Sequence, residues 1–312
     1  MPATASVGFL GLGSMGKGMA TNLQKFLSSE GEAKSFQPFL SVWNRSEARL
    51  KPLVDIGAKS ASVEAIARHC DVVFAMVFDD AAVRSMFQQY LKASPSAGSI
   101  FIDCATVHPD LTKEHAALAK QHGVQYLGCP VFGRPDAAMA KQLLVASAGD
   151  PAACAKVRPL LEAMGRGIID VGHRPELGHA LKLCGNFWIT SVVELIAESM
   201  TLSDASGVPR EVFTNLITNM YPGSFVGGYM KRMGQNDPEV FKITPENPGF
   251  AVEGAIKDTG LISQLGKQHG VNMAVADLVN QHMRDVKQQG YGEMGELVLL
   301  LRRQAGVMPG AP

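Results

Sequence analysis

The sequence predicts an α/β fold in which a doubly wound parallel sheet is followed by an all-helical C-terminal domain. In the first half of the chain, short apolar runs typical of strands alternate with amphipathic stretches typical of helices. Such alternation is the signature of a parallel sheet covered by helices on both faces. After about Gly172 the strand pattern ends. We therefore expect a sheet domain at residues 1–174 and a helical domain at residues 175–312.

The expected elements follow from these patterns. Strands are expected at residues 7–10, 39–43, 72–77, 99–102, 125–127, 143–148 and 168–171. In the same half, helices are expected at residues 15–26, 46–56, 62–69, 81–90, 111–122 and 151–164. The second half should hold one long helix at residues 176–206 and shorter ones at 210–219, 252–269, 275–289 and 295–304. Residues 28–38, rich in Ser, Glu, Gly and Lys, are expected to form an extended surface connection.

A complete G-x-G-x-x-G pattern lies between the first expected strand and helix. Gly11 lets the chain turn off the strand, Gly13 leaves room for a pyrophosphate, and Gly16 lets the helix pack close to the sheet. The helix N-terminus then offers backbone N–H groups to the phosphates. Glycine-rich turns also serve plain strand-to-helix connections, but this context favours a dinucleotide site of the Rossmann type. The residues between the glycines, Leu12, Ser14 and Met15, complete the expected loop.

The end of the second expected strand indicates which dinucleotide binds. NAD enzymes usually place a carboxylate here, which accepts hydrogen bonds from the ribose hydroxyls. This chain has Asn44, Arg45 and Ser46 instead. A neutral amide tolerates a 2′-phosphate, and a guanidinium can pair with it through two hydrogen bonds. The sequence therefore predicts NADP(H) in preference to NAD(H), unless Arg45 is only a solvated residue at the start of the next helix.

Composition is typical of a cytoplasmic enzyme with a small-molecule substrate. Lys plus Arg equals Asp plus Glu at 29 each, so no global charge favours nucleic acid or an anionic membrane. No apolar run reaches the roughly 18 residues of a membrane span, and the short segment before Val7 lacks the charged and cleavable parts of a signal peptide. The five cysteines stand far apart with no C-x-x-C pair, so we expect neither a metal site nor a disulfide framework.

Lys182 is the candidate proton donor. Gly178, Lys182 and Asn186 fall at i, i+4 and i+8 on the expected long helix, so they share one face. A Lys placed beside a carbonyl can give its proton to the oxygen as hydride reaches the carbon, and burial would lower its pKa toward neutrality. A single Lys on a helix is more often a solvated residue. The catalytic interpretation therefore depends on the motifs around it.

These motifs together resemble the β-hydroxyacid dehydrogenase family, which contains 3-hydroxyisobutyrate dehydrogenases and glyoxylate or succinic semialdehyde reductases. The resemblance covers nearly the whole chain. Its carriers are residues 8–16, Asp103 to Pro109, Cys129 to Gly133, Gly178 with Lys182 and Asn186, and Lys257 with Asp258.

The resemblance implies roles for single residues. Lys182 matches the catalytic position, Thr106 a residue near the nicotinamide, and Asn186 one that holds the substrate. Lys257 and Asp258 match a pair that closes over the cofactor and substrate, although such a pair could also be an ordinary surface ion pair. Val77 and Phe78 match the loop under the adenosine and ribose, where Phe78 either stacks or belongs to the core.

The chain departs from the family pattern where the substrate is expected. The family commonly reads Pro-Val-Ser-Gly-Gly, whereas this chain reads Pro-Val-Phe132-Gly133-Arg134. Phe132 removes a hydroxyl that would donate to a substrate carboxylate. The amides near Gly133 and the Arg134 guanidinium remain as an anion site, although Arg134 could equally point to solvent. Ala105 also stands where the family often has Ser. These changes admit a larger, less polar carbonyl.

The sequence thus predicts an NADP(H)-dependent oxidoreductase acting on a small aldehyde acid, keto acid or hydroxy acid. An imine or apolar-ketone reductase on the same fold is the first alternative; Lys182 argues against it and Phe132 favours it. A non-catalytic, cofactor-bound interaction module is the second, and neither basic tails nor added domains support it. The resemblance and the apolar run near Trp188 favour a homodimer or homotetramer, although that run could also be core.

Overall fold

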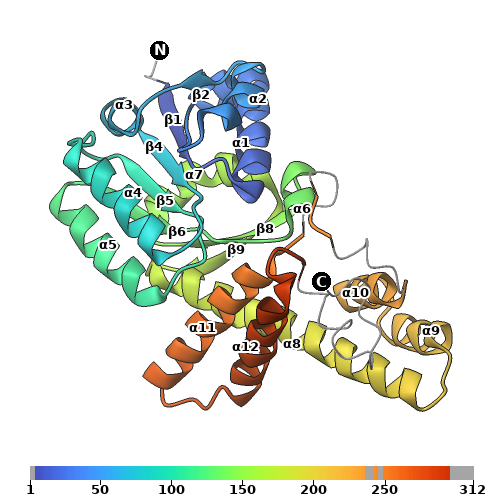
Figure 1. The fold of residues 1–312 in the computed structure, drawn as a ribbon. Coiled ribbons are helices and arrows are strands. Elements are labelled where there is room, and N and C mark those ends of the chain that lie inside the picture. Colours follow the sequence, from blue (N-terminus) through green and yellow to red (C-terminus); the bar gives the residue numbers. More distant parts are fainter. Residues whose placement is uncertain (1–3, 236–241, 245–248, 296–312) are drawn as a thin grey trace. The chain divides into compact units, whose positions relative to one another are not determined.

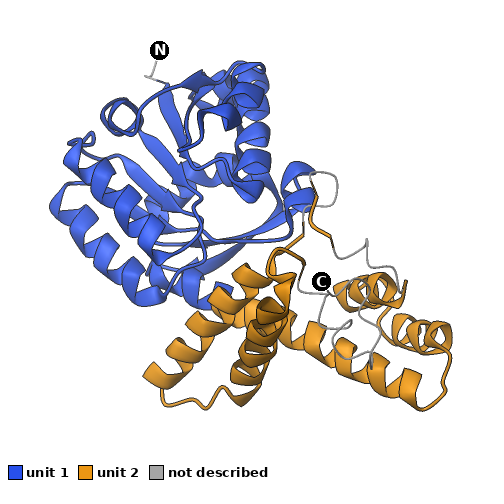
Figure 2. Ribbon diagram, in the orientation of Figure 1, with its two compact units in different colours: residues 1–182 blue, residues 183–312 orange. Residues whose placement is uncertain are grey.

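The computed structural model describes residues 4–235, 242–244 and 249–295. The chain divides into two compact units, Met1–Lys182 and Leu183–Pro312, shown in blue and orange in Figure 2. The expected boundary at residue 174 lies just before a long helix, α8 (Glu176–Ala205), and the division into units falls inside that helix.

The first unit is built around one sheet of nine strands. They are β1 (Ala5–Leu10), β2 (Phe36–Trp43), β3 (Lys59–Ser60), β4 (Val72–Ala75), β5 (Ile100–Asp103), β6 (Gln125–Gly128), β7 (Val131–Phe132), β8 (Leu143–Ala148) and β9 (Gly165–Gly172). Their order is β3-β2-β1-β4-β5-β6-β8-β7, and β9 pairs with β8. The chain leaves β1 toward one side and returns at β4 on the other, which confirms the doubly wound sheet.

The strands from β3 to β6 are parallel, as predicted. The far edge differs, because β8 runs antiparallel to both β6 and β7 and only β9 is parallel to it. A parallel return needs a crossover of a dozen or more residues, usually a helix. Between β6 and β8 the chain instead forms β7 and a five-residue helix, α6 (Pro135–Met139).

Helices cover both faces of this sheet (Figure 1). They are α1 (Ser14–Phe26), α2 (Lys51–Val54), α3 (Val63–His69), α4 (Asp80–Lys92), α5 (Pro109–Gln121) and α7 (Pro151–Met164), with short helical turns η1 (Leu27–Gly31), η2 (Glu32–Lys34) and η3 (Glu47–Arg49). Four of the helices begin at side-chain caps, and the cap of α5 is His108, which accepts from the Asp110 N–H. Ser62, Asp79 and Asp150 each accept a hydrogen bond from the backbone N–H three residues later.

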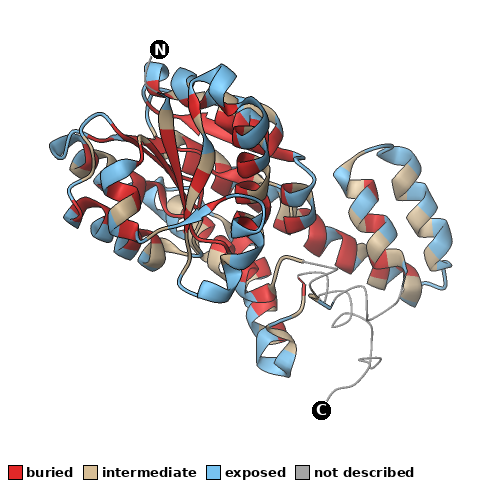
Figure 3. Cartoon of the chain, turned by 90° about the horizontal axis from the view of Figure 1, so that it is seen from above, coloured by how far each residue is buried: buried red, intermediate tan, exposed pale blue. Residues whose placement is uncertain are grey.

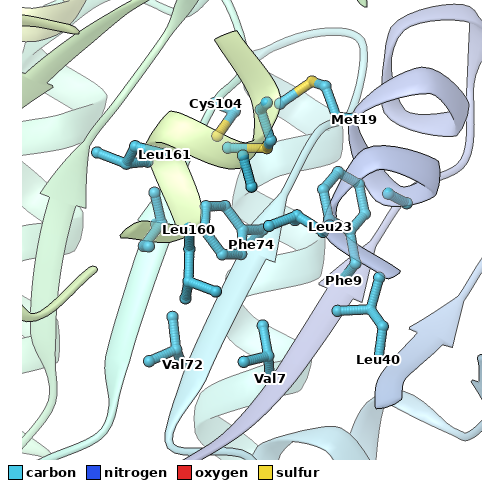
Figure 4. Packing of buried hydrophobic residues seen from close by; sticks show 14 of the residues in the cluster. Val7, Phe9, Met19, Leu23, Leu40, Val72, Phe74, Cys104, Leu160 and Leu161 are labelled. Carbon is cyan, nitrogen blue, oxygen red and sulfur yellow. The ribbon is translucent and has the colours of Figure 1, made fainter. Parts of the chain in front are cut away.

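Alternate residues of each central strand pack against opposite helical layers. On β4, Phe74 packs with α1 and α7, whereas Val73 packs with α3 and α4. Figure 4 shows the first of these layers, with Phe9 and Phe74 stacked at a centroid distance of 6.0 Å. Buried residues are concentrated in the strands and on the helix faces that cover them (Figure 3). Burial on both faces explains why the strands read as continuous apolar runs.

Several predicted elements have different bounds. The helix expected at 46–56 is split into η3 and α2, because Pro52 lacks the N–H that a continuous helix would need. Residues 28–38 are not an extended connection: they continue α1 through η1 and η2 and then enter β2. The strand expected to reach Val77 ends at Ala75. The short elements β3, β7 and α6 were not predicted.

The second unit is helical, as predicted. After α8 it contains α9 (Arg210–Met220), α10 (Phe225–Gly234), α11 (Val252–Gln268), α12 (Ala274–Val286) and the turn η5 (Lys287–Tyr291). Of these, α10 was not predicted, and most of the helix expected at 295–304 lies outside the described residues. The core contains several methionines, among them Met200, Met230 and Met283. His282 Nδ1 of α12 lies 2.7 Å from Glu194 Oε1 of α8, so a hydrogen bond links the two helices.

Within the described residues, α8 is long and apolar enough to cross a membrane, with a mean hydropathy of 1.3 in an 18-residue window. The core helix of a soluble protein meets the same criterion, and half of this window is buried. The sequence predicted no apolar run of this length, because charged residues such as Lys182 and Glu194 are spaced along α8.

Candidate active site

The glycine-rich loop joins β1 to α1 at the carboxyl edge of the sheet. Gly11 has a φ of +98°, and a Cβ there would lie 2.3 Å from the Met76 carbonyl oxygen. A Cβ on Gly16 would lie 2.0 Å from the carbonyl oxygen of Gly11. Both positions therefore require glycine because the backbone is packed against backbone.

Gly13 is different, because the protein leaves space around it. The nearest atom to a Cβ at Gly13 would be Nη1 of Arg49, at 3.9 Å. Gly13 is also the N-cap of α1 and forms no side-chain capping hydrogen bond. The first turn of α1 thus offers N–H groups beside an open backbone, and this cradle fits a dinucleotide pyrophosphate.

Asn44 shapes this loop from the end of β2. Its Oδ1 accepts a hydrogen bond from the Leu12 N–H at 2.8 Å, and its Nδ2 donates to the Ser46 carbonyl at 2.9 Å. The predicted Arg45 and Ser46 are exposed just beyond it. Sequence reasoning missed Arg49, whose signal was a second basic residue four positions after Arg45.

The loop after β5 carries Thr106 between two fixed backbone points. Asp103 Oδ1 accepts from the Ala105 N–H at 2.9 Å, and the Asp80 carboxylate accepts from the His108 N–H at 3.3 Å. Thr106 is half-buried between them. The polar residues at both ends thus hold the position that the family resemblance assigns to the nicotinamide region.

Val77 and Phe78 follow β4 at the same edge of the sheet. Val77 packs against the buried cluster that includes Val83 and Ala105, and its Cγ1 lies 3.1 Å from where a Gly11 Cβ would be. Phe78 is 56% exposed, so it is not a core residue. The structure therefore brings Val77 to the glycine loop and leaves the Phe78 ring accessible.

The first turn of α8 packs directly on the end of β6. A Cβ on Gly178 would lie 2.3 Å from the Gly128 carbonyl oxygen, and one on Gly128 would lie 2.9 Å from the His179 ring. This approach buries His179 with its Nε2 3.7 Å from Asp103 Oδ2. Two glycines thus hold the start of the Lys182 helix at the carboxyl edge of the sheet.

Asp103 belongs to a buried polar cluster beneath this edge. The Tyr126 hydroxyl donates to Asp103 Oδ2 at 2.9 Å and lies 3.4 Å from His115 Nδ1. Burial raises the pKa of Tyr126 well above its usual value, so the phenol remains protonated. Burial also lowers the pKa of His115 to about 4, which keeps this imidazole neutral at pH 7.

Lys182 lies one turn after His179 and is 9% exposed. Its Nζ is 4.6 Å from the centroid of the Phe132 ring, which ends β7. Gly133 follows with a φ of +138° and is exposed, and the Nε of Arg134 lies 3.7 Å from Asp136. The structure therefore brings Lys182 and Phe132 together and places Arg134 beside a carboxylate of its own helix.

In the second unit, Asn186, Lys257 and Asp258 form a cluster of polar side chains. Asn186 Nδ2 donates to Asp258 Oδ2 at 2.6 Å, and Lys257 Nζ lies 2.8 Å from Asp258 Oδ1. Asp258 is 1% exposed. Lys257 and Asp258 are therefore not an ordinary surface pair, and the Asn186 amide group that donates is already engaged by Asp258.

Comparison with known proteins identifies the family of this chain. Residues 6–172 match the family described as the NAD binding domain of 6-phosphogluconate dehydrogenase. Residues 177–301 match the family described as NAD-binding of NADP-dependent 3-hydroxyisobutyrate dehydrogenase. The chain belongs to the β-hydroxyacid dehydrogenase family. It is thus an NAD(P)-binding oxidoreductase, and the resemblance stated from its motifs is confirmed.

Members and structural neighbours of this dehydrogenase family cover nearly the whole chain. The NAD-dependent L-serine dehydrogenase of Pseudomonas aeruginosa is 28% identical over 92% of this chain and 94% of its own. The 3-hydroxyisobutyrate dehydrogenase of Mycobacterium tuberculosis, solved with L-serine, has a TM-score of 0.82 at 23% identity, over 97% of this chain and 100% of its own. An imine reductase from Myxococcus stipitatus with NADP⁺ has a TM-score of 0.58 at 23% identity, over 94% and 98%. These two structures show a shared fold.

The different surroundings of Gly13 and Gly16 predict different effects of adding one methyl group. Gly13→Ala should keep the free energy of unfolding nearly unchanged, because the protein leaves room. It should weaken cofactor binding about tenfold or more, since an overpacked contact costs about 1–3 kcal/mol. Gly16→Ala should lower stability without cofactor by at least about 1–3 kcal/mol. Denaturant unfolding and fluorescence titration with NADPH measure the two effects; equal destabilisation by both variants would contradict this interpretation.

Proposed function

We propose that this protein transfers hydride between NADP(H) and a small aldehyde acid, keto acid or hydroxy acid, with Lys182 as general acid and base. The observation that carries the proposal is the position of Lys182. It is nearly buried on a helix that packs against the carboxyl ends of β5 and β6, the edge that also bears the glycine loop. Ligands of open α/β sheets bind at this edge.

The chemistry proposed for Lys182 is proton transfer. When bound, the nicotinamide cofactor supplies the hydride to the carbonyl carbon or takes it back. In reduction, the Lys182 ammonium gives a proton to the carbonyl oxygen, so that C=O becomes CH–OH. In oxidation, its amine takes the hydroxyl proton. Thr106 would orient the reacting groups within unit 1, and Gly133 with Arg134 would bind the substrate carboxylate.

Lys182→Ala should lower turnover about 10²- to 10⁴-fold, the usual contribution of positioned proton transfer. NADPH affinity should change little, because the glycine loop is untouched. The assay is NADPH consumption with glyoxylate, succinic semialdehyde, an apolar ketone and a cyclic imine. Lys120→Ala, at an exposed position on α5, is the matched control. Wild-type turnover by Lys182→Ala would refute the assignment.

We propose a preference for NADP(H) because two guanidinium groups follow β2. Arg45 and Arg49 are exposed, and Arg49 reaches the space beside Gly13. The strand end itself offers no carboxylate to the ribose, since the residue there is Asn44, whose Oδ1 accepts a hydrogen bond from the Leu12 N–H of the glycine-rich loop. A 2′-phosphate would find charge-assisted hydrogen-bond donors at this position.

Replacement of Arg45 or Arg49 by Ala should weaken NADPH binding about tenfold each, given about 1.5–3 kcal/mol for a hydrogen bond to a charged group. NADH binding should stay unchanged. Lys51→Ala is the control, because Lys51 lies in the same segment and pairs with Asp55 at 2.9 Å. Equal losses for both cofactors, or none for either, would count against the proposed preference.

Reduction of imines or apolar ketones is the second candidate function. Phe132 presents a ring without a hydrogen-bond donor beside Lys182, which suits an apolar substrate. The fold is also shared with an imine reductase. In the substrate panel above, turnover of the imine or ketone alone would favour this function over that of a carbonyl-acid reductase.

We further propose that the protein is a homodimer or homotetramer. Apolar side chains are exposed along one stripe of α8 and one of α9, at spacings of seven and four residues. They are Trp188, Leu195 and Leu202, and Val212, Leu216 and Met220. Six large apolar side chains exposed on two helices of one unit are typical of a protein–protein contact.

A second copy is the occupant that we expect for this surface. Leu195→Glu combined with Leu202→Glu should lower the molar mass measured by light scattering to that of a monomer. Leu278→Glu, at an exposed leucine on α12, is the matched control and should leave the mass unchanged. A wild-type protein that is monomeric at micromolar concentration would overturn the proposal.

A further inference from the structure

Phe132 and Lys182 form a contact that the proposed reaction does not by itself require. The Lys182 Nζ lies 4.6 Å from the centroid of the Phe132 ring, within the range of a cation–π interaction. Lys182 is 9% exposed, and Phe132 is half-buried. The pair is therefore shielded from water, where such an attraction is stronger than at an exposed site.

The backbone fixes the Phe132 side of this contact. Val131 and Phe132 pair with Val145 and Leu144 of β8, so the ring ends a strand whose register is set. At Gly133 the φ of +138° turns the chain away, and a Cβ there would lie 2.6 Å from a Leu143 methyl group. The backbone that carries the Phe132 ring is therefore fixed by strand pairing and close packing.

The Lys182 side is fixed as well. Its helix is held one turn earlier, where Gly178 meets the Gly128 carbonyl and His179 lies against Asp103. The Lys side chain is long and has four rotatable bonds, so a contact at its ammonium group restricts the rotamers open to it. An aromatic face attracts the ammonium without accepting a conventional hydrogen bond, so the Phe132 ring itself takes up no N–H group that could donate to a carbonyl oxygen.

We propose that Phe132 is a positioning residue that holds the Lys182 ammonium in place for proton transfer. This inference rests on the proposed function of Lys182. Phe132 acts through Lys182 and need not touch the substrate. Its removal therefore lowers kcat by the same factor for substrates of different size and leaves the KM for NADPH unchanged.

The test compares Phe132→Tyr and Phe132→Trp, which keep an aromatic face, with Phe132→Leu, which keeps apolar bulk alone. We expect Phe132→Leu to lower kcat about 2- to 30-fold, the range that corresponds to a cation–π attraction. The aromatic variants should remain within about twofold of the wild type on the same scale. Phe39→Leu is the matched control, because Phe39 lies under Lys59 at 3.3 Å, another cation–π pair of the sheet unit.

The kinetic readouts separate this inference from the function on which it rests. If Lys182→Ala abolishes turnover while Phe132→Leu, Phe132→Tyr and wild type are equal, the positioning role is overturned and the function of Lys182 stands. If the loss for Phe132→Leu differs between glyoxylate and succinic semialdehyde, Phe132 contacts the substrate directly and the positioning role is again overturned. Wild-type turnover by Lys182→Ala overturns both. Thermal unfolding and the aromatic variants control for a general loss of folding.

Discussion

Two contacts of backbone against backbone, each permitted only by glycine, place the candidate catalytic groups of the sheet unit. Gly16 lets α1 approach the Gly11 carbonyl, and Gly178 lets α8 approach the Gly128 carbonyl. The first contact aims a helix N-terminus along the carboxyl edge of the sheet. The second brings a different helix, with Lys182 on its next turn, to the same edge. A methyl group at either position would push a helix away from the strand ends that it serves.

The buried Asp103 carboxylate connects the loop of Thr106 with the start of α8. One carboxylate oxygen accepts from the Ala105 N–H and so fixes the loop of Thr106. The other accepts from the Tyr126 hydroxyl and lies beside His179, three residues before Lys182. A buried carboxylate is costly unless it is hydrogen-bonded. The groups that form these hydrogen bonds also fix the loop of Thr106, so the buried polar cluster and the candidate active site depend on one another.

Much of this could be predicted from the sequence because the signals were local. The glycine spacing indicated the cradle, and alternating apolar runs indicated the strands. The two-residue strands β3 and β7 and the five-residue helix α6 were missed, because so short a segment shows almost no periodicity. The antiparallel far edge was missed for the same reason, since those short elements replace the crossover helix. Asn44 was expected near the cofactor, but its contact with Leu12 depends on two distant segments meeting.

Phe132 shows that the function of a residue, like the fold, can depend on contacts between distant segments that the sequence does not reveal. In sequence, a Phe in place of Ser is a lost hydroxyl and hence a lost contact with a substrate carboxylate. In the structure, the Phe132 ring also lies beside the Lys182 ammonium. This electrostatic contact cannot be predicted from the residue type alone. Arg134, the second departure in this segment, lies beside Asp136 instead of standing as a lone cation. Both departures in this segment thus have a charged neighbour in the fold, because the Lys182 ammonium lies beside Phe132 and the Asp136 carboxylate lies beside Arg134.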